Sequence, residues 1–215
     1  MSGDDPYIYP DSGVLRNKFH IHDAATLDRV ERLLVVQRMR EGVPEGNFDL
    51  AHLRAIHRHL FRDVYDWAGE VRTVEISKGG NRFQLSRYID TGMSHVVGRL
   101  EEADYLRGLS PEDFAAKAGP VIGDVNYVHP FREGNGRAQM HYLQQLAEHA
   151  GHELLLEHVD PARWIEAAQA SYAGDYGPMS VEIGRAMGID DLQVAPTVPK
   201  PDISRSHSPT VEPDL

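Results

Sequence analysis

The chain has 215 residues, 41% of them hydrophobic and 26% charged, which is typical of one globular domain with a tail. It contains no cysteine, so disulfides and thiolate sites are excluded. A formal net charge of −11 argues against direct binding to DNA or RNA, and the lack of an apolar run of about 18 residues argues against a membrane span.

The composition divides the chain into three parts. Residues 1–20 predict an irregular lead-in because they are rich in Gly, Asp, Pro and Tyr. They lack the basic start and apolar centre of a secretory signal, which favours a cytoplasmic location. An effector delivered by a specialised secretion system would need no such signal, so export stays open. Residues 21–191 are expected to form one domain, and the Pro- and Ser-rich residues 192–215 predict a disordered tail.

Apolar residues recur at helical spacing through most of the domain and predict a mainly α fold. Asp49 and Ser110 are good N-caps, and Gly69 and Gly151 are good helix terminators. The predicted helices cover residues 24–41, 50–68, 89–105, a stretch from Pro111 through Val125, 134–149, 161–173 and 181–187.

One β-hairpin is predicted within this helical pattern. Residues 70–76 (EVRTVEI) alternate in polarity and include β-branched residues, as a strand does. Residues 78–81 (KGGN) predict a turn, and residues 82–85 predict the returning strand. An isolated hairpin is marginally stable, so we expect it to pack against the helices.

The run from His129 to Arg137 (HPFREGNGR) combines four groups suited to phosphate chemistry. Glycines around Asn135, followed by a helix, can form a backbone anion cradle, although a simple tight turn is the alternative. Glu133 can hold Mg²⁺ and Arg137 can bind a phosphate. His129 can accept the proton of an incoming hydroxyl.

Two neighbouring residues are predicted to have structural roles. Pro130 stiffens the loop, and Phe131 anchors it in the core. The run is not a Walker loop, because no Gly-Lys-Ser/Thr follows the glycines, and the second half of the protein-kinase signature is also missing.

The nine residues resemble the signature of Fic-domain proteins, His-x-Phe-x-Asp/Glu-Gly-Asn-Gly-Arg-x-x-Arg. The resemblance to toxin-type bacterial Fic proteins covers about residues 6–190, including PYIYPDSGVLRNK and HLRAIHRHLFRDVYDWAGEVRTVEISKGGNRF. It implies a helical bundle with a small hairpin, the flap, beside the active site. It also implies transfer of AMP from ATP-Mg²⁺ to a Ser, Thr or Tyr hydroxyl of a target protein, with release of pyrophosphate.

The resemblance implies a role for each motif residue. His129 would be the catalytic base, Glu133 the Mg²⁺ ligand and Arg137 the partner of the β-phosphate. The phosphate cradle would consist of Gly134, Asn135 and Gly136. The flap residues expected to position the target are Ile76, Ser77, Lys78, Gly79 and Phe83.

Met140 departs from the signature, because it stands where the second arginine is expected to bind the γ-phosphate. Methionine cannot make a charge-assisted hydrogen bond, and on a helix it tends to pack in the core. Four alternatives follow. The protein transfers AMP slowly, it uses a different phosphate donor such as a phosphocholine compound, His141 or Arg132 compensates for the missing arginine, or the protein is a non-catalytic binding module.

The resemblance also implies partners. Targets in toxin-type relatives include ATPase subunits of type II topoisomerases, and targets in effector-type relatives include host GTPases. Many Fic proteins carry an inhibitory Ser/Thr-x-x-x-Glu-Gly/Asn motif, which is absent from this sequence. In this respect the sequence resembles the class of Fic proteins whose inhibitor is a separate small antitoxin that carries the motif.

Overall fold

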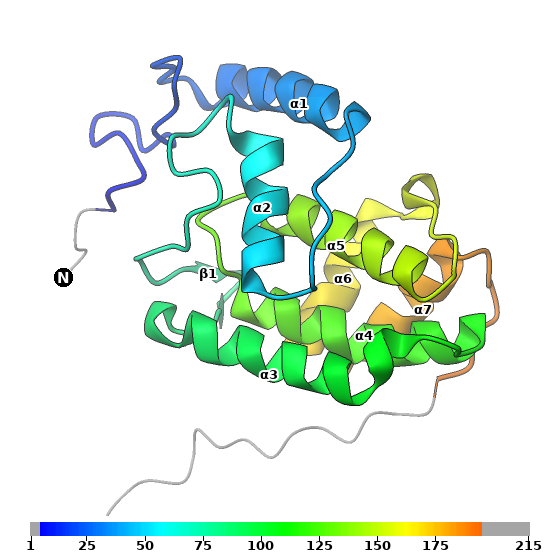
Figure 1. The fold of residues 1–215 in the computed structure, drawn as a ribbon. Coiled ribbons are helices and arrows are strands. Elements are labelled where there is room, and N and C mark those ends of the chain that lie inside the picture. Colours follow the sequence, from blue (N-terminus) through cyan, green and yellow to red (C-terminus); the bar gives the residue numbers. More distant parts are fainter. Residues whose placement is uncertain (1–4, 195–215) are drawn as a thin grey trace, which may run out of the picture.

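The computed structural model describes residues 5–194, which form a bundle of seven α-helices with one short hairpin (Figure 1). The helices are α1 (Ala24–Arg40), α2 (Leu50–Phe61), α3 (Ile89–Glu102), α4 (Pro111–Val128), α5 (Asn135–His149), α6 (Pro161–Tyr172) and α7 (Gly177–Ala186). The hairpin pairs β1 (Ser77–Lys78) with β2 (Asn81–Arg82) in antiparallel register. The fold class predicted from the sequence, mainly α with one hairpin, is confirmed.

Side-chain caps explain where several helices begin. Asp23, Asp49 and Ser110 each accept a hydrogen bond from a backbone N–H in the first turn of α1, α2 and α4. The first helix, α4, α5 and α6 lie where the sequence predicts them. Helix α7 begins four residues earlier than predicted, because Gly177-Pro178 forms its first turn, where proline is tolerated.

The predicted extent of two helices was wrong. Helix α2 ends at Phe61 rather than near Gly69, because the next residues form turns in which the amides of Val64 and Tyr65 both donate to the Phe61 carbonyl. The apolar spacing continues through these turns because their side chains are buried. The third helix ends at Glu102, since three residues that follow its cap, Asp104, Tyr105 and Leu106, have positive φ angles of 48°, 52° and 63°.

The hairpin is shorter than predicted and displaced along the chain. Residues 70–76 are not a strand, because the middle of this segment pairs with parts of the molecule outside the hairpin. The amide of Arg72 donates to the Pro130 carbonyl, and the amide of Thr73 donates to the Tyr7 hydroxyl. The strands comprise residues 77–78 and 81–82, across a turn at Gly79-Gly80 where both φ angles are positive, and one further bond runs from the Phe83 amide to the Ile76 carbonyl.

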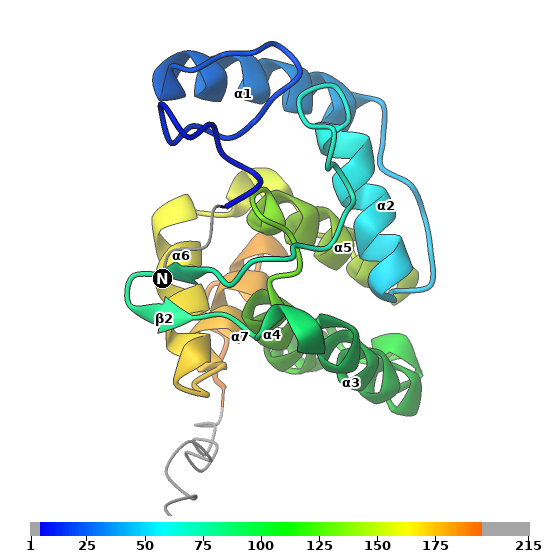
Figure 2. The same ribbon diagram turned by 90° about the vertical axis from the view of Figure 1, so that its left-hand side faces the viewer.

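The core is centred on α4, which contacts α3, α5, α6 and α7. Helix α5 lies between α2 and α4 (Figure 1), and both contact it. The hairpin packs beside α6 (Figure 2), where Phe83 meets Tyr172 edge to face at 5.4 Å between ring centroids. The hairpin therefore rests on the helices, as expected.

Residues near both ends of the described chain also pack against the rest of the molecule. Tyr7 packs edge-on against Trp67 with ring centroids 5.5 Å apart, and Leu192 joins the hydrophobic core. The tail predicted for residues 192–215 lies outside the described residues, apart from 192–194. Within residues 5–194, no helix has the length and apolar character needed to cross a membrane.

Candidate active site at the junction of α4 and α5

The loop between α4 and α5 has two left-handed ends. His129 ends α4 with φ 47°, and Gly134 precedes α5 with φ 81°. The side chain of Asn135 closes the loop: its Oδ1 accepts from the Phe131 amide at 2.9 Å and its Nδ2 donates to the Phe131 carbonyl at 2.8 Å. Phe131 is fully buried, which agrees with its predicted anchoring role.

A buried histidine from α2 supports the same loop. His57 Nε2 donates to the Glu133 carbonyl at 2.9 Å, and its Nδ1 accepts from the Gly69 amide at 2.8 Å. Burial lowers the pKa of His57 to about 3, so the ring is neutral and its tautomer is fixed by these two bonds. The ring also stacks on Phe131 at 3.9 Å. His57 therefore positions the backbone of the motif.

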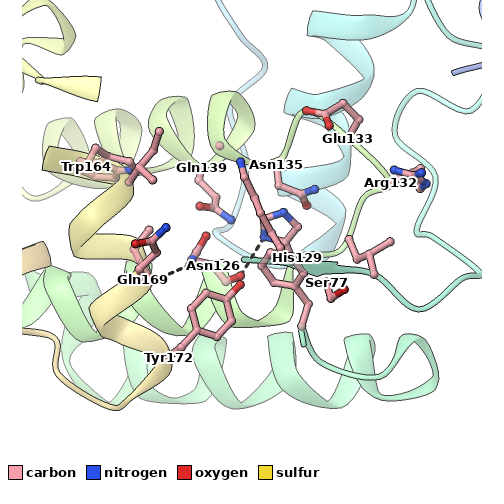
Figure 3. Close-up of a pocket in the computed structure, with 16 residues that line it drawn as sticks. Ser77, Asn126, His129, Arg132, Glu133, Asn135, Gln139, Trp164, Gln169 and Tyr172 are labelled. Carbon is pink, nitrogen blue, oxygen red and sulfur yellow. Dashed lines mark hydrogen bonds between the residues drawn. The ribbon is translucent and has the colours of Figure 1, made fainter. Parts of the chain in front are cut away.

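A cavity of about 290 Å³ opens in front of the loop (Figure 3). The motif contributes His129, Glu133 and Gly136 to its wall, and the hairpin contributes Ile76 and Phe83. Figure 3 shows Trp164, Gln169 and Tyr172 of α6 on the other side of the cavity from the motif. The Tyr172 hydroxyl is buried and has no hydrogen-bond partner among the described residues.

His129 is held as a neutral imidazole with a defined tautomer. Its Nδ1 lies 3.0 Å from the carbonyl oxygen of Asn126, so Nδ1 must donate and Nε2 carries the lone pair. Burial lowers the pKa of His129 to about 4, and the charges of Arg72 and Lys78 act in the same direction. The ring stacks on Phe83 with centroids 3.6 Å apart. This arrangement suits a proton acceptor at neutral pH.

Arg72 connects the hairpin to the motif. Its guanidinium is buried and donates to the backbone carbonyls of His129, Val74 and Gln84. These carbonyls belong to the end of α4 and to both arms that lead to the hairpin. Arg72 therefore fixes the distance between the hairpin and His129.

Glu133 combines exposure with a place on the cavity wall. Its side chain is 50% exposed, and its Oε1 accepts from the Gly134 amide at 2.9 Å. Among residues 5–194, no group of three or more acidic or histidine side chains could hold a metal ion. Glu133 is the one acidic side chain among the described residues that line the cavity.

Arg137 lies beside the cavity rather than in its wall. Its Nη1 is 2.6 Å from Glu31 Oε1 of α1, and its guanidinium carbon lies 4.6 Å above the centre of the Phe61 ring. Its Nη2 is 3.7 Å from Glu133 Oε1. Three neighbours thus hold the guanidinium between α1, α2 and the motif.

The structure separates the remaining predicted residues. Ile76, Ser77, Lys78 and Phe83 line the cavity, whereas Gly79 lies exposed at the hairpin tip. Gly134 is buried against Phe61 and His57, and a Cβ added to it would lie 2.4 Å from Phe61 Cζ.

Position 140 carries no cation into the cavity. Met140 is partly buried against the core and is not part of the cavity wall. His141 is buried with its Nε2 unpaired among the described residues, and it is also absent from the wall. Arg132 does line the cavity, and its Nε donates to Asp5 at 2.9 Å. Of the two residues considered as substitutes, only Arg132 is suitably placed.

Sequence reasoning missed Arg72, His57, Glu31 and the α6 wall of the cavity. An arginine inside an apolar alternating segment is a usable signal for Arg72, because a buried guanidinium must find several acceptors. The other residues carry no such signal, since a histidine or glutamate within a helix is ordinarily interpreted as a surface or packing residue.

Comparison with known proteins places this geometry in a family. The sequence profile of the Fic/DOC family matches residues 47–147. A probable protein adenylyltransferase of Sinorhizobium fredii is 42% identical over 183 residues, covering 85% of this chain and 95% of that protein. A probable protein adenylyltransferase Fic of Salmonella typhimurium is 36% identical over 187 residues, covering 86% and 93%.

Solved structures agree with these sequence relatives. The BepC protein of Bartonella tribocorum, a VirB-translocated effector crystallised with bound AMPPNP, matches with a TM-score of 0.77 at 27% identity, covering 86% of this chain and 98% of that one. The chain therefore belongs to the Fic/DOC family, in which the curated relatives described above carry the name protein adenylyltransferase.

Proposed function

We propose that this protein is a nucleotidyltransferase that moves AMP from ATP to a hydroxyl side chain of a target protein. The observation that carries the proposal is the state of His129, a neutral imidazole with an available Nε2 on the wall of a cavity that also contains the start of α5. The names of the relatives, protein adenylyltransferase, support the same reaction.

In the proposed reaction, His129 is the base. The target hydroxyl gives its proton to Nε2 as its oxygen forms a bond to the α-phosphorus of ATP. The bond from the α-phosphorus to the oxygen that bridges to the β-phosphate breaks, and pyrophosphate leaves. The Nδ1 bond to the Asn126 carbonyl keeps the ring oriented and stabilises the imidazolium that forms.

The phosphates are proposed to lie at the start of α5. The first backbone N–H groups of a helix have no partner within the helix and carry partial positive charge. Gly136 lies at this end of α5, on the cavity wall, and no atom of the described residues outside the helix lies within 4 Å of a Cβ added there. The side chain of Asn135 is engaged with Phe131, so its part in the cradle is that of its backbone N–H.

Magnesium fits the residues at this site. Mg²⁺ in nucleotide sites is usually held by one or two carboxylates together with substrate phosphates and water. Glu133 is half exposed, lies on the cavity wall, and uses Oε1 for the Gly134 amide. Glu133 would therefore hold Mg²⁺ beside the phosphates, and the ion would supply neutralisation of their negative charge.

The target segment is proposed to lie along the hairpin. Ser77 and Lys78 are exposed and line the cavity, so an extended segment of another protein could pair there with its hydroxyl near His129. A topoisomerase ATPase subunit, a GTPase, a small antitoxin and a cytoplasmic location stay predictions. Among the alternatives, use of a different phosphate donor has a specific basis in Met140. A non-catalytic module has no such basis, because the surroundings of His129 are intact.

Labelling with radioactive ATP tests the proposal. The purified protein is incubated with a cell lysate and either α-³²P-ATP or γ-³²P-ATP, with His129→Ala as the paired variant. Label from the α position alone, lost in the variant, is expected. Label from the γ position would indicate a kinase. No label from either nucleotide, with ATP still bound, would favour a binding module.

Two glycine substitutions should separate folding from phosphate binding. Gly134→Ala places a Cβ against Phe61 at a positive φ, and we expect it to lower the free energy of unfolding by about 2–3 kcal/mol. Gly136→Ala has no atom within 4 Å of its Cβ and should raise that free energy by up to about 1 kcal/mol. Only Gly136→Ala should weaken ADP binding without lowering the free energy of unfolding, because its Cβ enters cavity space. Thermal unfolding and calorimetric titration would measure the two effects, and a stable Gly136→Ala protein with unchanged ADP affinity would contradict the cradle.

A further inference from the structure

Glu31 is an acidic residue in the middle of α1 that is nearly inaccessible to solvent. Its side chain is 9% exposed, although the neighbouring residues Arg32 and Leu33 are exposed. Its Oε1 pairs with Arg137 at 2.6 Å, and its Oε2 accepts a short hydrogen bond from the hydroxyl of Tyr65, which is 1% exposed. Both carboxylate oxygens are therefore engaged inside the molecule.

A buried carboxylate is stable only when a cation and hydrogen bonds compensate it. Among the described residues, Arg137 is the cation that forms an ion pair with Glu31. The short hydrogen bond from Tyr65 holds the carboxylate in place, and burial together with the charge of Glu31 raises the pKa of Tyr65, so its proton stays on the hydroxyl. Glu31 is thus a fixed point for the Arg137 side chain.

The contacts leave part of Arg137 available. Glu31 takes Nη1, the face of the guanidinium lies over Phe61, and 30% of the side chain remains exposed. A guanidinium has five N–H donors in a rigid fork, so fixing one end determines where the other donors point. A free arginine side chain, by contrast, would have to lose rotamer freedom each time an anion binds.

We propose that Glu31, supported by Tyr65, is a positioning residue that preorients Arg137 for the β-phosphate of the nucleotide. The proposal rests on the proposed function, which places the phosphates at the start of α5, because Arg137 belongs to the first turn of that helix. It makes α1, which contributes no residue to the cavity wall, a part of the nucleotide site. The effect of removing Glu31 must then depend on whether the ligand has a β-phosphate.

The test compares the affinity of ADP and AMP in the presence of Mg²⁺ by calorimetric titration. Glu31→Ala is expected to weaken ADP binding about tenfold, because Arg137 loses its fixed rotamer, and to change AMP binding less than twofold. Glu31→Gln keeps an oxygen acceptor without the charge, so its ADP affinity should fall between those of Glu31→Ala and the unchanged protein. Glu41→Ala is the matched control, because Glu41 at the end of α1 also pairs with an arginine, Arg38, and lies away from the cavity.

Each outcome has a distinct meaning. Equal weakening of ADP and AMP would show that Glu31 only supports the fold, and tighter ADP binding would show that it competes with the phosphate; either result overturns the proposal, as does unchanged ADP affinity. Failure of the unchanged protein to bind ADP would instead overturn the proposed function. Tyr65→Phe, which removes one hydroxyl, provides a second variant should Glu31→Ala not fold, and it should weaken ADP binding in the same selective way.

Discussion

Replacement of His129 by alanine is expected to lower the rate of AMP transfer by about 10²–10⁴-fold, the range that a positioned general base contributes. The imidazole is neutral, its Nδ1 is fixed by the Asn126 carbonyl, and Nε2 is the remaining acceptor. Alanine removes this acceptor without adding bulk to the cavity. The measurement is the initial rate of α-³²P transfer to the target at saturating ATP.

Two controls distinguish loss of the base from loss of the site. His129→Ala should bind ADP with nearly the affinity of the unchanged protein, because the phosphates are proposed to lie at the start of α5. His95→Ala, at an exposed position of α3, should leave the transfer rate unchanged. A His129→Ala protein that keeps more than about a tenth of the rate would show that another group accepts the proton.

The dependence of the transfer rate on pH should also report the pKa of His129. Because burial lowers the pKa of His129 to about 4, the free protein holds its base form throughout the neutral range. The acid limb of kcat/KM should therefore fall near pH 4, well below the range of an ordinary histidine. Bound phosphates add negative charge, which favours the imidazolium, so the limb of kcat should lie at higher pH. Lys78→Gln should also move the limb of kcat/KM upward, because the charge of Lys78 lowers the pKa of His129.

Local signals allowed much of this fold to be predicted. The caps Asp49 and Ser110 and the glycine stop at Gly151 depend on residues a few positions apart, so sequence patterns contain them. The end of α2 could not be predicted in this way. Its apolar spacing runs on through Trp67, whose ring packs against Tyr7 of the N-terminal segment, while the Tyr65 hydroxyl bonds Glu31 of α1. No local sequence pattern contains these long-range contacts.

The same distinction between local and long-range contacts applies to the candidate site. The motif from His129 to Arg137 is contiguous, so its chemistry could be inferred from the sequence. The residues that orient it come from distant segments: His57 from α2, Arg72 before the hairpin and Glu31 from α1. Each acts through one or two hydrogen bonds to the motif, and no spacing rule connects residues that meet only after the chain has folded.

Met140→Arg is expected to raise kcat/KM for ATP by about tenfold. Position 140 lies one helical turn after Gly136 on α5, and residues four apart share a face of a helix. Met140 is partly buried rather than enclosed, so a longer side chain can extend toward solvent and the phosphates. One charge-assisted hydrogen bond to a phosphate typically contributes about 1.5–3 kcal/mol, of which part is lost to ordering the side chain. Initial rates at low ATP concentration measure this effect.

The gain should be specific for the γ-phosphate, and this specificity is the decisive part of the prediction. Met140→Arg should bind ATP more tightly and ADP no more tightly than the unchanged protein, whereas Met140→Gln, of similar length but uncharged, should change neither. Equal gains for ATP and ADP would mean that the arginine acts only by its general charge. No gain for ATP would contradict the idea that position 140 limits the reaction, and Arg132, the cation on the cavity wall, would then be the residue that replaces the missing arginine. In that case Arg132→Ala, made in the protein that keeps Met140, should weaken the binding of ATP more than the binding of ADP, because only ATP would lose a contact to its γ-phosphate.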